Sequence, residues 1–205
     1  MDVLGLEDII PLEEFAAKRR EFASAHRRYL DRYRRVRLGP SLTLVFENRQ
    51  TLWYRVQEVL RLTRLEHRRN LAEARLVKQE LDLYNRLLPG RDRLQAALLI
   101  AVDETRLTED LAFWHDLRGD QLTLRLGSVS YPANLLTCRP EDRTIGAAHW
   151  IQFVLDPEGR RLLTTRTSPT HFRIDLPGYN HDSGPLSEEV CRSLGEDLLL
   201  SERVG

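Results

Sequence analysis

The side chains that could do chemistry in this 205-residue chain are ionisable groups at positions where the sequence pattern predicts burial. Glu47 ends an alternating apolar run, Glu58 falls on the mixed face of a predicted helix, and His149 lies on the more apolar face of a predicted strand. Buried ionisable groups are enriched at functional sites. Because carboxylate and imidazole ligands suit iron, manganese or zinc, we consider Glu47, Glu58, His149 and Asp175 as one candidate site for a divalent metal or another ligand.

A second group of polar side chains lies in one short stretch near the C-terminus. Asp175 and Tyr179 bracket a Pro-Gly pair, and His181 and Asp182 follow directly. This stretch is the best local candidate for the edge of a metal or substrate site, because two carboxylates, an imidazole and a phenol come close together. A simple turn also explains the Pro-Gly pair. The full candidate set is Glu47, Glu58, Arg61, His149, Asp175 and Tyr179.

Each of these residues also has a structural explanation. A buried histidine such as His149 can satisfy its ring by bonding a backbone carbonyl or a carboxylate. Glu47 immediately precedes a predicted helix cap, Asn48, where a negative charge stabilises the helix N-terminus. Glu58 and Arg61 are three residues apart on one helix and can form an ion pair. Both interpretations are therefore carried forward.

Familiar catalytic signatures are absent from the sequence, which contains no GxGxxG, P-loop, GxSxG, HExxH or EF-hand loop. Cys138 and Cys191 are far apart, so neither a disulfide framework nor a structural zinc site is indicated. A small-molecule enzyme using Glu58 and His149 as acid and base ranks last, because no nucleophile motif accompanies them. Whether the protein is an enzyme, and on which substrate, stays open.

The charge of the chain is balanced overall and uneven locally. It contains 31 basic and 31 acidic side chains, a neutrality that argues against nucleic acid as the main partner. The segment 18–37 nevertheless holds nine basic residues against two acidic ones. Within it, Arg27, Arg28, Arg34 and Arg35 are candidates for docking onto an acidic partner.

The hydropathy of the sequence predicts a protein that does not insert into a membrane. No apolar run approaches the roughly 20 residues that a membrane-spanning helix needs. The first residues include acids where a secretion signal would have a basic start. We therefore expect a soluble, cytoplasmic protein without membrane insertion.

Apolar periodicity predicts a mixture of helices and strands. Helices are expected over about 12–33, 49–66, 70–88, 107–117, 157–163 and 187–200. Strands are expected in hairpins over about 35–47 and 122–131, and at 94–102, 147–155 and 171–176. This order lacks a regular βαβ repeat, so we predict one α+β domain over 1–205, with a largely antiparallel sheet packed with several helices.

Several stretches of the chain resemble an uncharacterised bacterial family, domain of unknown function 3501. The stretches are LEEF at 12–15, LGPSLTLVFENR at 38–49, Thr51, VQE at 56–58, LR at 60–61, ELDLYN at 80–85, LP at 88–89 and DLPGY at 175–179. The resemblance spans about residues 10–200. Its recurrent polar positions fall on Glu47, Arg49, Gln57, Glu58, Arg61, Glu80, Tyr84, Asn85, His149, Asp175 and Tyr179.

The resemblance implies a redox setting, because genes of the family often lie beside those for rubrerythrin-like and iron–sulfur proteins. It also exposes departures: members usually have glutamine near Arg55, glutamate near Ala101 and histidine where Leu176 stands. If those groups serve a site, this chain has lost part of it. We therefore expect a redox-associated accessory protein with a carboxylate–histidine metal or ligand pocket, either intact or degenerate. The alternative is a non-catalytic interaction module that docks through its basic N-terminal helix.

Overall fold

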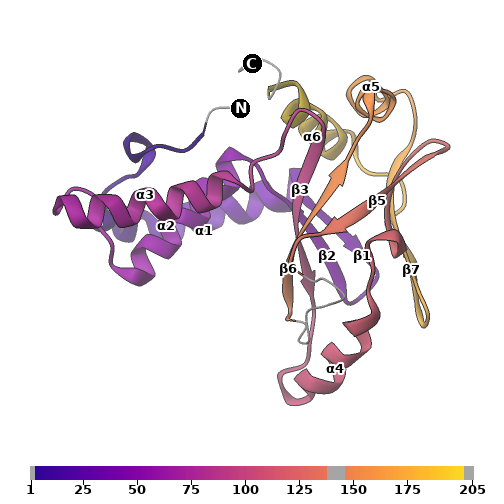
Figure 1. Ribbon diagram of the computed structural model, residues 1–205, viewed down its shortest axis with the longest axis horizontal. Helices are drawn as coiled ribbons and strands as arrows, with labels where there is room; N and C mark the ends of the chain where they lie inside the picture. The colour runs from indigo at the N-terminus through magenta and orange to yellow at the C-terminus, as the bar shows by residue number, and fades with distance from the viewer. Residues whose placement is uncertain (1–2, 138–145, 201–205) are drawn as a thin grey trace.

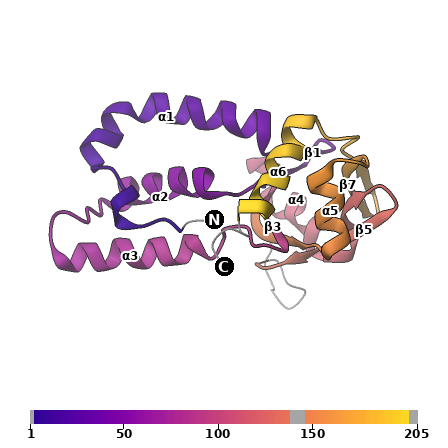
Figure 2. The ribbon, with the colours of Figure 1, turned by 90° about the horizontal axis from the view of Figure 1, so that it is seen from above.

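The computed structural model describes residues 3–137 and 146–200 and divides into a helical arm and a strongly curved sheet (Figure 1). The arm consists of α1 (Leu12–Tyr33), α2 (Arg49–Thr63) and α3 (Leu71–Asn85). Figure 2 shows α2 between the other two helices. The sequence predicts this arrangement, because α2 carries apolar side chains on two faces.

Side-chain caps fix the beginnings of two arm helices. The Asn48 side chain accepts a hydrogen bond from the Thr51 N–H at the start of α2, and Asn70 does the same for Glu73 at the start of α3. Such caps satisfy backbone donors that a helix leaves unpaired. Apolar side chains of α2 and α3, including Val56, Leu60, Val77 and Leu81, then form a cluster within the arm.

The sheet of the described chain has eight strands, all paired antiparallel. They are β1 (Arg35–Leu38), β2 (Leu42–Phe46), β3 (Arg93–Ile100), β4 (Leu122–Leu126), β5 (Val129–Leu135), β6 (Ala148–Val154), β7 (Thr170–Leu176) and β8 (Tyr179–Asp182). Their spatial order is β1-β2-β3-β6-β5-β4-β7-β8. The predicted fold class, an α+β protein with a largely antiparallel sheet packed with several helices, is confirmed.

The sheet curves into a nearly closed barrel, and Tyr179 of β8 joins its two edges. The Tyr179 hydroxyl donates to the Leu38 carbonyl (2.5 Å) and accepts hydrogen bonds from the Ser41 and Leu42 N–H groups (2.9 and 3.1 Å). Apolar side chains fill the interior, where the centre of the Phe172 ring lies 5.2 Å from those of both the Phe46 and the Phe153 rings. The barrel is thus a packed core.

Short helices cover the two ends of the barrel. α5 (Pro157–Thr165) and α6 (Glu188–Leu200) lie at one end, and α4 (Leu107–Phe113) lies at the other (Figure 1). The 3₁₀ turns Leu6–Asp8, Glu104–Arg106, Trp114–Asp116 and Gly119–Gln121 complete the described elements. No helix in the described part of the chain combines the length and the apolar character needed to cross a bilayer.

The predicted elements differ from the structure mainly at their ends. The helix expected over 107–117 is α4 followed by a 3₁₀ turn, and the strand expected to end near 131 continues to Leu135. Strand β8 is missing from the sequence prediction, because its residues Tyr179–Asp182 were interpreted as following a turn. It is mostly polar and is recognisable only through its pairing with β7.

Candidate functional site

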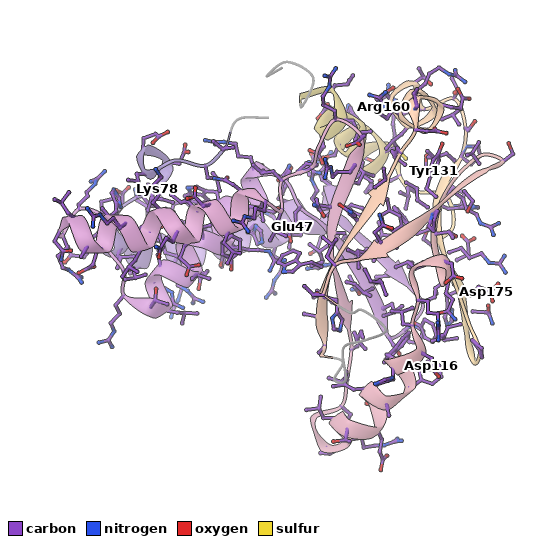
Figure 3. All side chains as sticks on the ribbon, viewed as in Figure 1. Glu47, Lys78, Asp116, Tyr131, Arg160 and Asp175 are labelled. Carbon is purple, nitrogen blue, oxygen red and sulfur yellow. The ribbon has the colours of Figure 1, made fainter. Side chains whose placement is uncertain are left out.

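The carboxylates and the histidine expected to form one site lie in different parts of the fold. Figure 3 places Glu47 at the junction of arm and barrel and Asp175 on the far side of the barrel. Glu58 is on α2 with its side chain bonded to α1, and His149 is on β6. Among residues 3–137 and 146–200, no three histidine, cysteine, aspartate or glutamate side chains gather where they could hold a metal ion. The structure therefore does not bring the predicted metal site together.

Glu58 belongs to an ion-pair cluster that joins α1 to α2. Its carboxylate accepts hydrogen bonds from Arg19 (2.8 and 3.2 Å) and from Arg61 (3.0 and 3.3 Å). Burial disfavours the charge, but the two guanidinium groups outweigh it and hold the pKa of Glu58 below its ordinary value. The Glu58–Arg61 pair predicted from their spacing is confirmed, and its role here is to tie the helices together.

The other three candidates each contact neighbouring residues of the fold: His149, Asp175 and Tyr179. His149 is buried, and its Nε2 donates to the Gly146 carbonyl oxygen at 2.7 Å. Asp175 is exposed, with Arg173 at 3.5 Å. The Tyr179 hydroxyl is occupied by the barrel closure described above. These contacts match the structural explanation for His149 and give Tyr179 one that the sequence did not suggest.

The four arginines expected to dock a partner are divided by the structure. Arg34 is buried and forms an ion pair with Asp197 of α6, so its predicted availability to a partner is wrong. Arg35 pairs with Asp31 one helical turn earlier. Arg27 and Arg28 are exposed on α1. Arg34 was misplaced because its partner is 163 positions away in the sequence.

Other polar positions of the resemblance hold the N-terminal segment against the arm. Arg49 Nη2 donates to the Asp8 carboxylate (2.6 Å), and the Asn85 side chain bonds both the N–H and the carbonyl of Leu4 (2.8 and 3.0 Å). The Trp53 indole N–H adds a bond to the Asp8 carbonyl (2.9 Å). These residues therefore serve the fold.

An aromatic cavity of about 340 Å³ lies at the α4 end of the barrel and includes Ala101 and Tyr179 in its lining. Its charged groups are engaged in local contacts: Arg106 pairs with Glu109 at 3.1 Å, and Asp110 accepts a loop N–H at 2.9 Å. Ala101, where the family resemblance implies a carboxylate, supplies only a methyl group. Both carboxylates of the lining, Glu109 and Asp110, are thus bonded to residues of the same segment of chain.

The junction of arm and barrel holds a different group of side chains, Glu47, Thr51, Arg55, Gln95 and Trp150, which we call the junction cluster. The Glu47 side chain is completely buried. Its Oε2 accepts a hydrogen bond from the Thr51 hydroxyl at 2.5 Å, and its Oε1 lies 2.7 Å from Arg55 Nη2. This ion pair lacks the orientation of a hydrogen bond, since Oε1 has no hydrogen-bond partner. The charge of a fully buried carboxylate is thus paired with one partly exposed guanidinium.

Neighbouring strands supply the rest of the junction cluster. The Arg55 guanidinium lies 5.3 Å from the centre of the Trp150 ring, within the range of a cation–π interaction. Burial, with the negative charges of Glu80 and Glu47, raises the pKa of Tyr84 on α3, although Arg55 opposes this. Sequence analysis named Glu47 as a candidate but missed its neighbours, because Gln95 and Trp150 come near it only through strand register.

His26 of α1 lies beside this cluster and is held in its neutral form. Its ring stacks on Tyr54 at 4.1 Å. Burial, and then the positive charges of Arg55 and Arg35, lower the pKa of His26 to about 4. An unfolded histidine takes up its proton near pH 6.5. Between these two values the unfolded chain therefore binds more protons than the folded chain.

This difference predicts an acid-sensitive stability. The contribution of neutral His26 is present above about pH 6.5 and is lost as the pH falls toward 4. Replacing His26→Gln should flatten the decline in the free energy of unfolding over that interval, measured by urea unfolding at several pH values. His115→Gln, at an exposed histidine, is the control and should keep the wild-type slope. Equal slopes in wild type and His26→Gln would contradict the prediction.

The fold and the junction cluster define an α+β barrel protein with a helical arm and a candidate binding site at their junction. The chain belongs to the family described as "Protein of unknown function (DUF3501)", whose model matches residues 4–198. The resemblance inferred from the sequence is thereby confirmed. Comparison with curated proteins gives no match.

A solved structure shares this fold. It is the crystal structure of a novel protein of unknown function from Burkholderia pseudomallei K96243, with 25% sequence identity and a TM-score of 0.83. The similarity covers 96% of this chain and 100% of the other. The barrel and the helical arm are therefore features that both proteins share.

Proposed function

We propose that the protein is a non-catalytic interaction module that docks onto an acidic partner through the outer face of α1. The observation that supports this proposal is the set of exposed guanidinium groups at Arg20, Arg27 and Arg28. Among the described residues, no acidic side chain lies within 4 Å of them, and Arg28 bonds only Ser24 (2.7 Å). Positive charge that the fold does not neutralise is available to a partner.

The position of α1 makes this face accessible. Arg20, Arg27 and Arg28 are seven and eight residues apart, so they lie on one side of the helix. Figure 2 shows α1 along the outer edge of the arm, away from α3. A partner can therefore approach the helix along most of its length without meeting the barrel.

The chemistry of such a surface favours steering by charge. Clustered arginines accelerate encounters with an acidic surface and form paired hydrogen bonds to carboxylates. Salt screens these attractions at distances of about 10 Å in 0.1 M solution. The association should consequently be strong at low salt and weak at high salt.

The family resemblance suggests which acidic partners to test first. Rubrerythrin-like and iron–sulfur redox proteins are the neighbours that it implies, and the redox-associated accessory role is kept as the setting of the proposed interaction. Docking itself requires no metal on this chain. The proposal therefore stands apart from the carboxylate–histidine pocket expected from the sequence.

The test is a binding measurement with purified rubrerythrin-like and iron–sulfur proteins encoded beside the gene. Reversing the charges with Arg20→Glu, Arg27→Glu and Arg28→Glu should weaken binding at low salt by at least about tenfold, since a hydrogen bond between charged groups is worth about 1.5–3 kcal/mol. The matched control reverses Arg75, Arg86 and Arg91, which are also exposed but lie outside α1. It should bind as the wild type does.

Two results would overturn the proposal. One is equal weakening by the α1 variant and by the control, which would show that only total charge matters. The other is binding that does not change between low and high salt. Circular dichroism of both variants ensures that each is folded before its affinity is compared.

A further inference from the structure

The junction cluster contains two buried side-chain oxygen atoms that accept no hydrogen bond. Glu47 Oε1 has an ion-pair partner but no hydrogen bond, as described above. Gln95 is also buried, and its Oε1 has no hydrogen-bond partner in the described structure. A buried polar group left without a hydrogen bond destabilises the fold, because it has lost its bonds to water. Native folds leave few such groups unpaired, and a bound ligand, ion or water is what usually satisfies them.

Strand register places these two oxygens on the same face of the sheet. The Glu47 N–H donates to the Gln95 carbonyl at 2.9 Å, directly beyond the pair Phe46–Ala96. Residues opposite each other on antiparallel strands project their side chains to the same side, about 5 Å apart. Trp150 projects there as well, because it pairs with Ala97, two positions beyond Gln95. The acceptors and the indole ring therefore belong to one surface.

Arg55 is the charged group of this surface that reaches solvent. Its side chain is 33% exposed, unlike that of Glu47. Its Nε is buried without a hydrogen-bond partner, and no other acidic side chain of the described residues pairs with it. A guanidinium held by one poorly oriented ion pair and by its contact with the Trp150 ring can exchange Glu47 for another carboxylate, to which it would bind through two parallel hydrogen bonds.

From these contacts we infer that the junction cluster binds a small zwitterion, a molecule with an ammonium and a carboxylate group attached to the same carbon atom, as in a free α-amino acid. The ammonium supplies three donors and takes the place of Arg55 against Glu47 Oε1 and Gln95 Oε1. Arg55 turns to the ligand carboxylate. The exchange keeps charges paired, since one internal ion pair becomes two between protein and ligand.

The test uses the full chain and isothermal titration calorimetry with free amino acids, beginning with L-alanine, L-leucine and L-glutamate. At least one should bind, and the corresponding amines and carboxylic acids alone should bind at least about tenfold more weakly, because each lacks one charged hydrogen-bond pair. Failure of every amino acid to bind would overturn the inference. So would an amine that binds as tightly as its parent amino acid.

Variants locate the site. Glu47→Gln should reduce the affinity by at least about tenfold, and Arg55→Gln should remove the preference for the amino acid over its amine. Glu58→Gln is the control. It changes a glutamate on the same helix as Arg55 that pairs with Arg19 and Arg61, and it should leave binding unchanged. Binding that persists at wild-type strength in both junction variants would place it elsewhere. If Glu47→Gln does not fold, Arg55→Gln alone decides.

A titration with metal ions completes the experiment. Mg²⁺, Mn²⁺ and Zn²⁺ are titrated without amino acid, because a carboxylate and an amide oxygen are also ligands for such ions. Little or no heat is expected from them. Metal binding that Glu47→Gln abolishes, without amino-acid binding, would replace the zwitterion by a metal ion and overturn the inference. The readout is independent of the docking proposed for α1.

Discussion

Replacing Asp197→Asn should lower the free energy of unfolding by about 3–5 kcal/mol, because it removes one charge of a buried pair and leaves the other. Arg34 and Asp197 each have side chains only 3% exposed, and a second bond joins Arg34 Nη2 to the carboxylate at 3.1 Å. Arg34 Nε also donates to the Tyr29 hydroxyl at 3.2 Å. Asparagine keeps the shape, so the loss reports on charge.

Urea unfolding at neutral pH measures this effect. Asp31→Asn removes the acid of the exposed pair with Arg35 and is the control, expected to change stability by less than about 1 kcal/mol. Replacing both buried partners, as Arg34→Met with Asp197→Leu, should recover much of the loss, because no unpaired charge remains. A loss below 1 kcal/mol in Asp197→Asn would show that the pair is not the buried contact described.

Tyr179→Phe is the second substitution with a large expected effect, a loss of about 2–5 kcal/mol. It removes one hydroxyl and leaves the Leu38 carbonyl and the Ser41 and Leu42 N–H groups without the bonds that close the barrel. Each buried group left unsatisfied costs about 1–3 kcal/mol. The ring of Tyr179 stays in place against Trp114, so little packing is lost.

Hydrogen exchange can locate this effect. The amide protons of Ser41 and Leu42 should exchange faster in Tyr179→Phe than in the wild type, together with lower stability in urea. Tyr33→Phe is the control, because the Tyr33 hydroxyl makes no hydrogen bond within the described chain. Unchanged stability and unchanged exchange would mean that Tyr179 does not close the barrel.

The fold was predictable wherever one periodic pattern governed a segment. The helix at 12–33 matches its prediction because its apolar residues recur at spacings of three and four. The strand at 93–100 is apolar on both faces because its outer face packs against the arm through Ala97 and Leu30, and its inner face lines the barrel. Closure of the sheet was not predictable, because it depends on the contact of Tyr179 with the distant Leu38.

The contacts of the candidate residues were likewise predictable only where they are local in the sequence. Glu58–Arg61 could be predicted, because both residues stand on one helix turn. Glu47 and Arg55 are eight residues apart, and their contact requires the chain to pass from a strand into a helix at a particular angle. Arg34 was assigned to a docking surface, because it continues the run of basic residues that ends α1. Tertiary partners thus decide the role of each charged group, as expected for buried ions.

The length of the arm would magnify any rotation at its base. Helix α1 has 22 residues, which makes it about 33 Å long at about 1.5 Å per residue. Its base is held by Arg34 against α6, and the base of α2 is held by Glu47 against Arg55. A tilt of about 5° at this base would carry the far end of α1 through about 3 Å, given that length. If the exchange of one ion pair rotated the base by this angle, the tip of α1 would therefore move by about the length of one hydrogen bond.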